Sequence, residues 1–416
     1  MTILGRALRA PRRLAEWAIR SRRSFPRWVN RAIDHVADNP DGLLGRLAAR
    51  SMGTYGPDDV PPPTAPPAAA RRVYIGPTNY AAQGWSWARS LDASGADVGA
   101  RNMAVEVPGG FSFAADTEVP VAVYHRSHEW QQRELEAVGA FTHVLFEAER
   151  PLFGRLFSRD VAAEVAALEE RGVVTAFMCH GTDVRLPSTH VDLTPWSPYR
   201  DPGLYLERYE NEARRNRALL DRLDRPTFVS TPDLLVDVPY ATWCPVVVDP
   251  RRWARPQRAP GGPLVVAHVP SHSTIKGTHL IRPALERLHT EGIVDYREIS
   301  GVPSAQMPDL YGAADVVLDQ FRLGSYGVAA CEAMAAGRIV VGHVLPQVRD
   351  TVLRETGLEL PVVEATPDTV EERLRELAAD PAYRAEVSVA GVDFVDRVHD
   401  GRRSASVLLE RWVDAR

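Results

Sequence analysis

The sequence predicts an α/β protein with two domains, each built around a parallel β-sheet. The chain has 416 residues, of which 45% are hydrophobic, and a single hydrophobic core rarely grows beyond roughly 250–300 residues. From residue 71 onward, short apolar runs alternate with amphipathic stretches, which is typical of parallel strands joined by helical crossovers. A Pro-rich stretch at 58–71 and an Arg-, Pro- and Gly-rich stretch at 251–263 mark breaks between the units.

These breaks predict four segments of the chain. Residues 1–70 combine a basic, amphipathic helical arm with the Pro-rich linker. Residues 71–248 form an N-terminal domain, and residues 249–393 form a second domain. Residues 394–416 form a C-terminal helix that we expect to cross back to the N-terminal domain.

Continuous apolar runs predict buried strands, because strands covered on both faces need no alternating polar residues. The runs lie at 71–76, 119–125, 142–149, 172–180, 228–232 and 241–250, and in the second domain at 264–271, 294–301, 315–321, 338–344 and 360–365. In open α/β sheets, ligands bind at the carboxyl ends of the strands. His125, Glu147, Glu149 and His180 come at the ends of such runs and are therefore candidates for a site.

Composition excludes several classes of protein. The formal net charge of −5, with mixed signs, gives no indication of nucleic acid as a partner. The three cysteines are far apart in the chain and match no zinc-binding spacing, so we expect reduced thiols, no metal and a cytoplasmic location. No apolar run approaches the roughly 18–20 residues that span a bilayer, and the N-terminus lacks the apolar core of a secretory signal.

The N-terminal arm is strongly basic, with nine arginines against one glutamate in the first 31 residues. Leucine, tryptophan and phenylalanine are interleaved, so residues 1–35 can rest on an anionic membrane surface, peripherally at the inner membrane face. The arm can equally be a solvated helix that packs against the body of the protein or a second copy. The sequence leaves both readings open.

Lysine is almost absent, because Lys276 is the only lysine among 49 Lys and Arg residues. A lysine retained in such a chain indicates a place that needs a compact ammonium rather than a planar guanidinium. Lys276 lies in a loop at 270–278 between a predicted strand and a predicted helix, where backbone amides favour a phosphate. The loop is not a P-loop, and no Gly-x-Gly-x-x-Gly follows a strand, which argues against a nicotinamide enzyme.

A second group of candidate residues follows the apolar run at 315–321. Asp319 and Gln320 end this run, and the glycines at 324 and 327 permit close backbone approach to a ligand. Glu332 falls early in the next predicted helix. A carboxylate at that place is a natural acceptor for ribose hydroxyls.

The segment from about 265 to 344 resembles the donor domain of glycosyltransferase family 4. The family's Lys-Gly motif matches Lys276-Gly277, and its Glu-Ala-Met-Ala-x-Gly motif matches residues 332–337. The resemblance implies the GT-B fold, in which two Rossmann-like domains face each other, and retaining transfer from a nucleotide diphosphate sugar as co-substrate. It also implies that the lysine holds the donor diphosphate, that the glutamate binds the ribose, and that the N-terminal domain takes the acceptor.

Two positions depart from the family's pattern. The glutamate that contacts the transferred sugar is replaced by Gly324, and the arginine five positions before the lysine is replaced by Ser271. We expect Asp319, Gln320 or the backbone near Tyr326 to take over the sugar contact. The predicted donor-binding residues are Ser271, Lys276, Gly277, Thr278, Asp319, Gln320, Tyr326, Gly327 and Glu332.

On the acceptor side, the resemblance makes His180 a second catalytic candidate beside Lys276. The family has a histidine or a similar polar residue at the comparable strand end, although a structural histidine fits that position equally well. The further acceptor or cleft candidates are Gly84, Asp183, Arg185 and His125. Asp183 and Arg185 can also simply pair with each other.

Two other functions stay open at this point. Gly324 and Ser271 are compatible with a GT-B scaffold that binds a nucleotide or a partner and has lost transfer. The basic arm is compatible with a membrane-surface assembly component. The chain has no Asp-x-Asp motif, which argues against a metal-bridged diphosphate.

Overall fold

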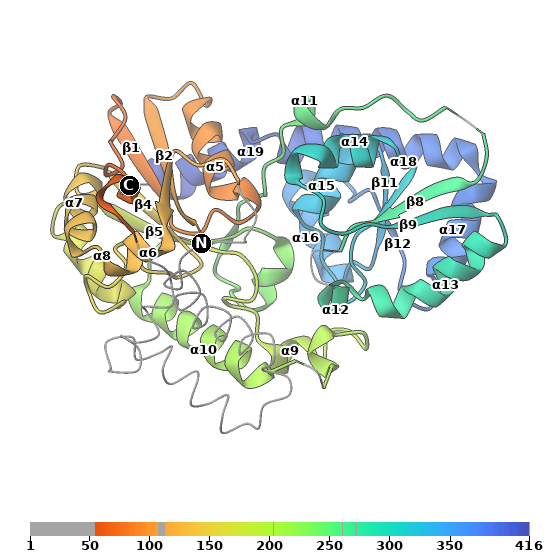
Figure 1. Cartoon of the computed structure of the whole chain (residues 1–416), viewed down its shortest axis with the longest axis horizontal. Helices are drawn as coiled ribbons and strands as arrows, with labels where there is room; N and C mark the ends of the chain where they lie inside the picture. Colours follow the sequence, from red (N-terminus) through yellow and green to blue (C-terminus); the bar gives the residue numbers. More distant parts are fainter. Residues whose placement is uncertain (1–54, 107–112, 203, 260, 271–272, 416) are drawn as a thin grey trace, which may run out of the picture.

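The structure is a computed structural model in which two α/β units lie side by side (Figure 1). It describes residues 55–106, 113–202, 204–259, 261–270 and 273–415. The predicted arm at 1–35 and the predicted donor residue Ser271 lie outside the described residues. Among the helices that are described, none is long and apolar enough to cross a membrane.

In the described part of the chain, the N-terminal sheet has seven parallel strands in the order β3-β2-β1-β4-β5-β6-β7. They are β1 (Arg71–Gly76), β2 (Val98–Glu106), β3 (Thr117–Pro120), β4 (His143–Glu147), β5 (Val174–Cys179), β6 (Thr227–Val229) and β7 (Thr242–Trp243). The strand order reverses between β1 and β4, and Rossmann-like sheets bind ligands at this switch point. The loops after β1 and β4 therefore border the candidate site of this unit.

Over the residues described, the second sheet has five parallel strands in the order β12-β11-β10-β8-β9. They are β8 (Leu264–His268), β9 (Val294–Glu298), β10 (Val316–Leu318), β11 (Ile339–Gly342) and β12 (Val362–Glu364). Here the order reverses between β8 and β10. The loops that follow these two strands carry Lys276 and Asp319, so both residues lie at the switch point.

Helices cover the sheets on both faces (Figure 1). In the first unit they are α5 (Gln83–Asp92), α6 (Val121–Arg126), α7 (His128–Val138), α8 (Val161–Glu169), α9 (Pro187–His190) and α10 (Leu206–Leu223). They continue with α11 (Pro250–Trp253), α12 (Ser273–Lys276), α13 (Thr278–Thr290), α14 (Met307–Gly312), α15 (Val328–Ala335), α16 (Pro346–Thr356), α17 (Val370–Ala379) and α18 (Pro381–Phe394). The chain closes with a π-helical turn (Val395–His399), α19 (Arg402–Leu408) and a second π-helical turn (Leu409–Val413). Short 3-10 turns lie at Pro57–Asp59, Tyr80–Ala82, Pro198–Arg200, Pro232–Val236 and Ser304–Gln306.

One predicted strand is wrong. The run at 119–125 splits at Pro120, which ends β3 and precedes α6. His125 therefore lies in the last turn of a helix and not at the end of a strand. A short apolar run does not by itself distinguish a buried strand from a buried helix, and proline favours the start of a helix once strand pairing stops.

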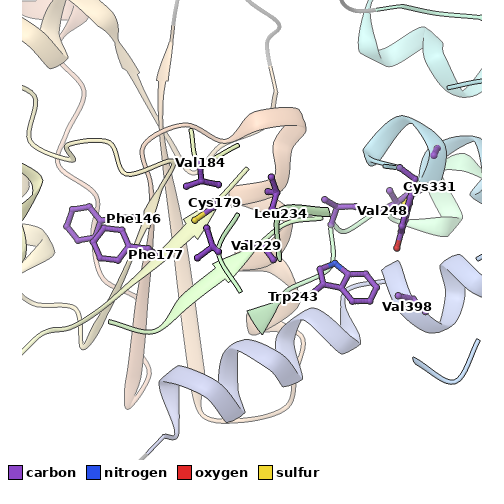
Figure 2. Packing of buried hydrophobic residues seen from close by; sticks show 14 of the residues in the cluster. Phe146, Phe177, Cys179, Val184, Val229, Leu234, Trp243, Val248, Cys331 and Val398 are labelled. Carbon is purple, nitrogen blue, oxygen red and sulfur yellow. The ribbon is translucent and has the colours of Figure 1, made fainter. Parts of the chain in front are cut away.

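A hydrophobic core is shared by the two units. It runs from Phe146 and Phe177 of the first sheet through Trp243 to Cys331 of α15 and Val398 (Figure 2). A second cluster packs Trp87 of α5 against Leu408 and Trp412 at the end of the chain. Since the burial of apolar surface is the main driving force for folding, these clusters hold the last residues of the chain on the N-terminal unit and hold the two units together.

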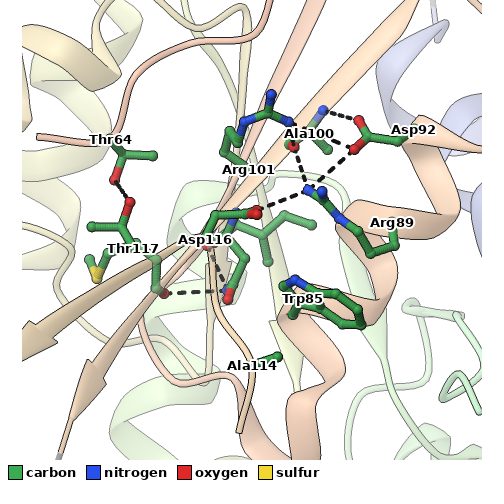
Figure 3. Close-up of polar contacts among 12 residues, drawn as sticks. Thr64, Trp85, Arg89, Asp92, Ala100, Arg101, Ala114, Asp116 and Thr117 are labelled. Atoms are coloured by element: carbon green, nitrogen blue, oxygen red, sulfur yellow. Dashed lines mark hydrogen bonds and ion pairs between the residues drawn. The ribbon is translucent and has the colours of Figure 1, made fainter.

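Arg89, in the last turn of α5, fixes this helix, which follows the loop after β1. Its Nη2 donates to the Ala100 carbonyl and to the Asp116 carboxylate, both at 2.9 Å (Figure 3). The guanidinium also lies 5.8 Å from the centre of the Trp85 ring, within the range of a cation–π contact. This network ties α5 to β2 and so gives residues 77–84 a rigid support.

Candidate functional site

Lys276 forms an ion pair with Asp319 at the carboxyl edge of the second sheet. Its Nζ lies 2.9 Å from Asp319 Oδ1, and the exposed fractions of the two side chains are 15% and 7%. The Lys276 carbonyl accepts a hydrogen bond from the Phe321 amide at 3.0 Å. The loop after β8 is therefore joined to the loop after β10 by both backbone and side chain, and the ammonium is held at the switch point.

Gly277 and Thr278 have structural reasons for their identity. Gly277 has a φ of +83°, and a Cβ there would lie 2.9 Å from Cγ of Arg322.

Burial lowers the pKa of His268 to about 4, so its ring is neutral. Its Nδ1 donates to the Leu318 carbonyl at 3.0 Å, and its Nε2 accepts from the buried Thr278 hydroxyl at 2.9 Å. The Thr278 hydroxyl thus joins α13 to the sheet, which leaves its backbone amide as the group that can face a phosphate.

Glu332 is the fifth of the eight residues of α15 and is partly buried. Burial raises its pKa to about 8, although the nearby Arg252 and Lys276 charges oppose this rise. No hydrogen bond or ion pair to its side chain is found within the described ranges. A carboxyl group that is desolvated and protonated can both donate to and accept from a hydroxyl of a ligand.

The loop at 324–327 has no room for a side chain at position 324. Gly324 has a φ of +68°, and a Cβ there would lie 2.4 Å from Cγ of Leu345. The Leu345 amide also donates to the Gly324 carbonyl at 2.9 Å. Gln320 shapes the same loop, because its Nε2 donates to the Ser325 carbonyl at 2.6 Å. The space of a side chain at 324 is therefore occupied by Leu345.

Gly327 and Tyr326 differ in what they can contribute to a donor site. Gly327 is the residue that precedes α15, and a Cβ there would meet no atom within 4 Å. The Tyr326 side chain is buried, and its hydroxyl lies 3.3 Å from Nε2 of His399. The Tyr326 ring is therefore part of the shared core, and the predicted donor contact of Tyr326 is one that its backbone would make.

His180 follows β5 and pairs with a buried glutamate at the end of β4. Its Nε2 lies 3.2 Å from Glu147 Oε1, and the Glu147 side chain is fully buried. The Tyr80 ring meets the imidazole edge to face, with centroids 5.2 Å apart. Each residue comes directly from the end of its strand, so the neighbouring positions of β4 and β5 in the sheet bring the pair together.

Gly84 lies against this pair. A Cβ at Gly84 would lie 2.6 Å from Nδ2 of Asn102 and 2.8 Å from Oε2 of Glu147. The Asn79 amide donates to the same carboxylate oxygen at 3.1 Å. The absence of a Cβ at Gly84 therefore makes room for the side chains of Asn102 and Glu147, which belong to the N-terminal sheet.

Asp183 and Arg185 do not pair with each other, so the ion pair that the sequence left open between them is not formed. The Asp183 carboxylate accepts from the His180 amide at 2.7 Å and from the Gly181 amide, so it shapes the loop that carries His180. Arg185 is buried and pairs with Asp233. Its position is structural, because a buried arginine with a carboxylate partner has little freedom to leave it.

His125 is not joined to these residues. It is largely buried in α6, and burial lowers its pKa to about 4, with Arg159 and Arg155 adding to the effect. Its ring meets that of Tyr124, with centroids 4.7 Å apart. No contact between His125 and His180 or Gly84 is found in the described residues, so the structure does not bring this candidate into the group.

Three side chains beside the His180 loop have the geometry of a metal-binding group. Ligand atoms of Glu149, Cys179 and Asp183 lie within 4.8 Å of one another. However, the Cys179 thiol donates to Glu149 Oε1 at 3.2 Å, and both Asp183 oxygens accept from backbone amides. Burial raises the pKa of Glu149 and of Cys179 well above their usual values. Glu149 and Cys179 therefore favour the protonated forms that hydrogen-bond to each other, whereas metal ligands must lose these protons.

The carboxyl edges of the two sheets meet through polar contacts that the sequence did not indicate. Ser325, after β10, donates to Asp233, after β6, at 2.5 Å. His190 of α9 has Nε2 3.1 Å from the Leu323 carbonyl, and Thr194 Oγ1 lies 3.2 Å from His343 Nε2. These contacts place the loops of the His180 sheet opposite those of the Lys276 sheet.

Arg322 makes several of these contacts. It donates to the carbonyls of Trp196 at 2.8 Å and Ser197 at 3.0 Å in the first unit, and to Thr274 at 3.0 Å in the lysine loop. Burial lowers its pKa. A second cation thus lies beside the Lys276 loop, but its donors are already used by backbone carbonyls.

The two Rossmann-like sheets, with their carboxyl edges opposed and the chain end packed on the first unit, decide the fold. The chain has the GT-B fold. Solved structures of similar shape include sucrose-phosphate synthase from Thermosynechococcus elongatus, with 14% identity, a TM-score of 0.48, and coverage of 81% of this chain and 96% of that chain. Anabaena Alr3699/HepE in complex with UDP and glucose has 11% identity and a TM-score of 0.49, and covers 81% and 98%. WaaG, a glycosyltransferase involved in lipopolysaccharide biosynthesis, has 14% identity and a TM-score of 0.47, and covers 80% and 98%. No protein-family model and no curated protein matches the chain.

Proposed function

We propose that this GT-B protein transfers a sugar from a nucleotide diphosphate donor to an acceptor, with retention and without a metal. One observation carries the proposal: the single lysine is held by Asp319 at the switch point of the second sheet, near a desolvated Glu332. This is the pair of groups that the family resemblance assigns to the diphosphate and to the ribose. The donor then lies on the second unit and the acceptor on the first.

The chemistry proposed for this site is electrostatic. The Lys276 ammonium and the backbone amides at the start of α13 stabilise the negative charge that develops on the leaving diphosphate. Such groups act without a covalent nucleophile, because they are already oriented when the bond breaks. Retention follows from the family resemblance, with the donor's own phosphate taking the proton of the acceptor hydroxyl.

In the first unit, His180 faces the transferred sugar. The Glu147 carboxylate lies 3.2 Å from its Nε2, and Nδ1 makes the contact outside the pair. Glu147 acts as a positioning residue in this arrangement, because its side chain is fully buried.

The test measures release of nucleoside diphosphate when the protein is incubated with a panel of nucleotide sugars and acceptors. We expect release with at least one donor, and a loss of about 10²–10³ in kcat for Lys276→Ala, the size seen when an oxyanion donor is removed. Lys276→Arg is the matched variant, because it keeps the charge but changes the shape of the cation. Turnover with no donor, together with unchanged nucleotide binding in Lys276→Ala, contradicts the mechanism.

A non-catalytic scaffold is the second candidate, and the filled space at Gly324 favours it. Leu345 packs where the family's sugar-contacting glutamate belongs, so one carboxylate contact to the transferred sugar is missing. A scaffold binds the nucleotide through the Lys276 site but releases no diphosphate from any donor. The same incubation therefore separates the two functions when it is paired with calorimetric titration of nucleoside diphosphates.

The membrane-surface role stays a prediction for the basic arm at 1–35, outside the described residues. Co-sedimentation of the protein with anionic vesicles, before and after deletion of residues 1–70, tests it. Equal co-sedimentation of the two proteins removes this reading.

A further inference from the structure

Tyr80 exposes an aromatic ring at the switch point of the first sheet. It lies in the loop after β1, and 45% of its surface is exposed, although a side chain of this size usually contributes to a core. Its ring meets the His180 imidazole edge to face, with the centroids 5.2 Å apart and the planes at 88°. The exposed part of the ring therefore lies beside the histidine that the proposed function places next to the transferred sugar.

The backbone on both sides of Tyr80 is strained. Asn79, Ala81 and Ala82 have φ angles of 49°, 49° and 61°, in the left-handed region that residues with a Cβ rarely adopt. None of the three positions is glycine, so the cost is not relieved by the sequence. Strain of this kind persists only where the surrounding structure holds it, and it concentrates at sites that bind ligands.

Two buried side chains hold the strained stretch at its two ends. At the first end, the Asn79 amide donates to Glu147 Oε2 at 3.1 Å, and Asn79 Oδ1 accepts from the Trp85 amide at 3.0 Å. At the other end, Gln83 Nε2 donates to the Ala81 carbonyl at 3.2 Å. The carboxylate that pairs with the imidazole after β5 therefore also fixes the loop after β1, so the positions of the histidine and of the exposed ring are set together.

The Tyr80 hydroxyl has no hydrogen-bond partner among the residues that the structure describes. Partial burial raises the pKa of this phenol, so the hydroxyl keeps its proton and can both donate and accept. The loop thus presents an apolar ring with a free polar tip. A sugar ring has the matching surface, since its C–H groups form an apolar face and its hydroxyl groups stand at the rim.

We propose that the acceptor is a sugar and that one of its rings packs on the exposed face of Tyr80. The inference rests on the proposed function, since it names the chemical class of the acceptor. The side chains around the ring favour a sugar over an acyl chain, because Asn79, Glu147 and His180 are polar and an acyl chain needs a continuous apolar groove. Tyr80 is then a residue that determines acceptor specificity, and the hydroxyl that receives the new bond is directed toward His180.

Saturation-transfer NMR of the full-length protein tests the contact without any donor. The probes are the methyl glycosides of glucose, galactose, mannose and N-acetylglucosamine. We expect at least one glycoside to receive saturation at its ring C–H protons. Tyr80→Ala should bind that glycoside about fivefold to tenfold more weakly, because a packed aromatic ring contributes on the order of that factor. Tyr80→Phe keeps the ring and should keep most of the affinity.

Tyr240→Ala is the matched control. Tyr240 is 55% exposed and precedes β7. Because all strands of this sheet are parallel, a residue before β7 lies at the edge opposite to the loop after β1. Tyr240→Ala therefore removes an exposed tyrosine of the same unit far from His180, and it should bind the glycoside as the wild type does.

Lys276→Ala separates the sugar site from the donor site. Saturation that persists in Lys276→Ala and weakens in Tyr80→Ala supports the inference, whether or not any donor is turned over. Three results overturn it: no saturation of any glycoside in the wild type, equal affinity in the wild type and Tyr80→Ala, or an equal loss in Tyr80→Phe and Tyr80→Ala. Loss of saturation in Lys276→Ala also overturns it, because the glycoside then occupies the donor site. Absence of donor turnover with this contact intact contradicts only the proposed function.

Discussion

Lys276 Nζ lies 2.9 Å from Asp319 Oδ1, so the residue that the sequence marks as exceptional is already paired before any donor binds. Asp319 is one of three groups that the sequence offers for the contact with the transferred sugar, beside Gln320 and the backbone near Tyr326. Its position indicates a different role, because the Asp319 carboxylate orients the Lys276 ammonium. Its negative charge also lies close to the place proposed for the diphosphate, where it opposes binding of an anion.

The first prediction concerns Asp319→Asn, which keeps the shape and the hydrogen-bond acceptor but removes the charge. We expect nucleoside diphosphate to bind this variant at least as tightly as the wild type, because a like charge has gone. We expect kcat to fall by about tenfold to a hundredfold, because the lysine is less firmly oriented. Calorimetry and a transfer assay measure the two effects, and Lys276→Ala is the comparison. If Asp319→Asn weakens nucleotide binding as much as Lys276→Ala does, the carboxylate itself contacts the donor.

The second prediction concerns the pH dependence of stability through Glu332. Burial raises its folded-state pKa to about 8, against 4.5 for an ordinary glutamate. Between these two values the folded protein holds a proton that the unfolded chain releases, so the free energy of unfolding falls as pH rises through this window. Glu332→Gln is neutral at every pH and loses this dependence.

Urea unfolding at about pH 5 and about pH 8 measures this effect. We expect wild type and Glu332→Gln to have similar stability near pH 5, and the variant to gain stability relative to the wild type near pH 8. Comparison of the two proteins removes the contribution of all other titrating groups. A difference that stays the same at both pH values shows that the Glu332 carboxyl is not desolvated.

Most of the fold could be predicted from the sequence, because most of its strands are continuous apolar runs. The strand β2 contains Arg101 and Asn102, is not such a run, and was not predicted. Residues 71–76 and 264–268 stand as strands where the pattern placed them. The run at 119–125 failed, since Pro120 ends the strand and α6 continues the apolar stretch. A pattern of apolar residues indicates that a segment is buried, and both a strand and a helix can be buried.

The candidate site could be predicted only in part. Lys276 and Glu332 were found because a motif carries them, and His180 because ligands bind where strands end. Glu147, the partner of His180, was also a candidate. The sequence could not show that the two pair, because the pairing depends on the neighbouring positions of β4 and β5 in the sheet. Arg322 and Asp233 gave no signal, since each bonds to a residue far away in the chain.

The third prediction concerns Gly324, which stands where the sequence resemblance leads one to expect a glutamate. Gly324→Ala meets two penalties: a φ of +68° and a Cβ 2.4 Å from Cγ of Leu345. The matched control is Gly357→Ala, which has a φ of +71° and open space around it. We expect the control to lose about 1 kcal/mol of stability from backbone strain, and Gly324→Ala to lose about 1–3 kcal/mol more from the clash.

Urea unfolding of both variants measures the difference, and Leu345→Ala provides a further check. In the Leu345→Ala background the space beside residue 324 is open, so the extra cost of Gly324→Ala should largely disappear. An equal loss for Gly324→Ala and Gly357→Ala in the wild-type background contradicts the prediction. In that case the space filled by Leu345 is not what excludes a side chain at position 324.

The fourth prediction concerns Arg322, which joins the two units through backbone carbonyls. Arg322→Ala leaves the carbonyls of Trp196 and Ser197 without their partner. A buried acceptor that loses its partner costs about 1–3 kcal/mol. We expect a lower free energy of unfolding and a larger radius of gyration, because residues 196–197 are no longer held on the second unit. Urea unfolding and small-angle X-ray scattering measure the two quantities.

Arg338 supplies the matched control for this experiment, because it is also a buried arginine that donates to several carbonyls. Its partners, which include Ala336 at 2.8 Å and Ala314 at 3.0 Å, lie within the second unit. Arg338→Ala should therefore lower stability without a change in the radius of gyration. Arg322→Lys keeps the charge but lacks the planar guanidinium that reaches carbonyls in different directions. Its radius of gyration should therefore be similar to that of Arg322→Ala. If neither Arg322 variant is larger in solution than the wild type, the shared hydrophobic core alone holds the two units together, and the Arg322 contacts are a consequence of that packing.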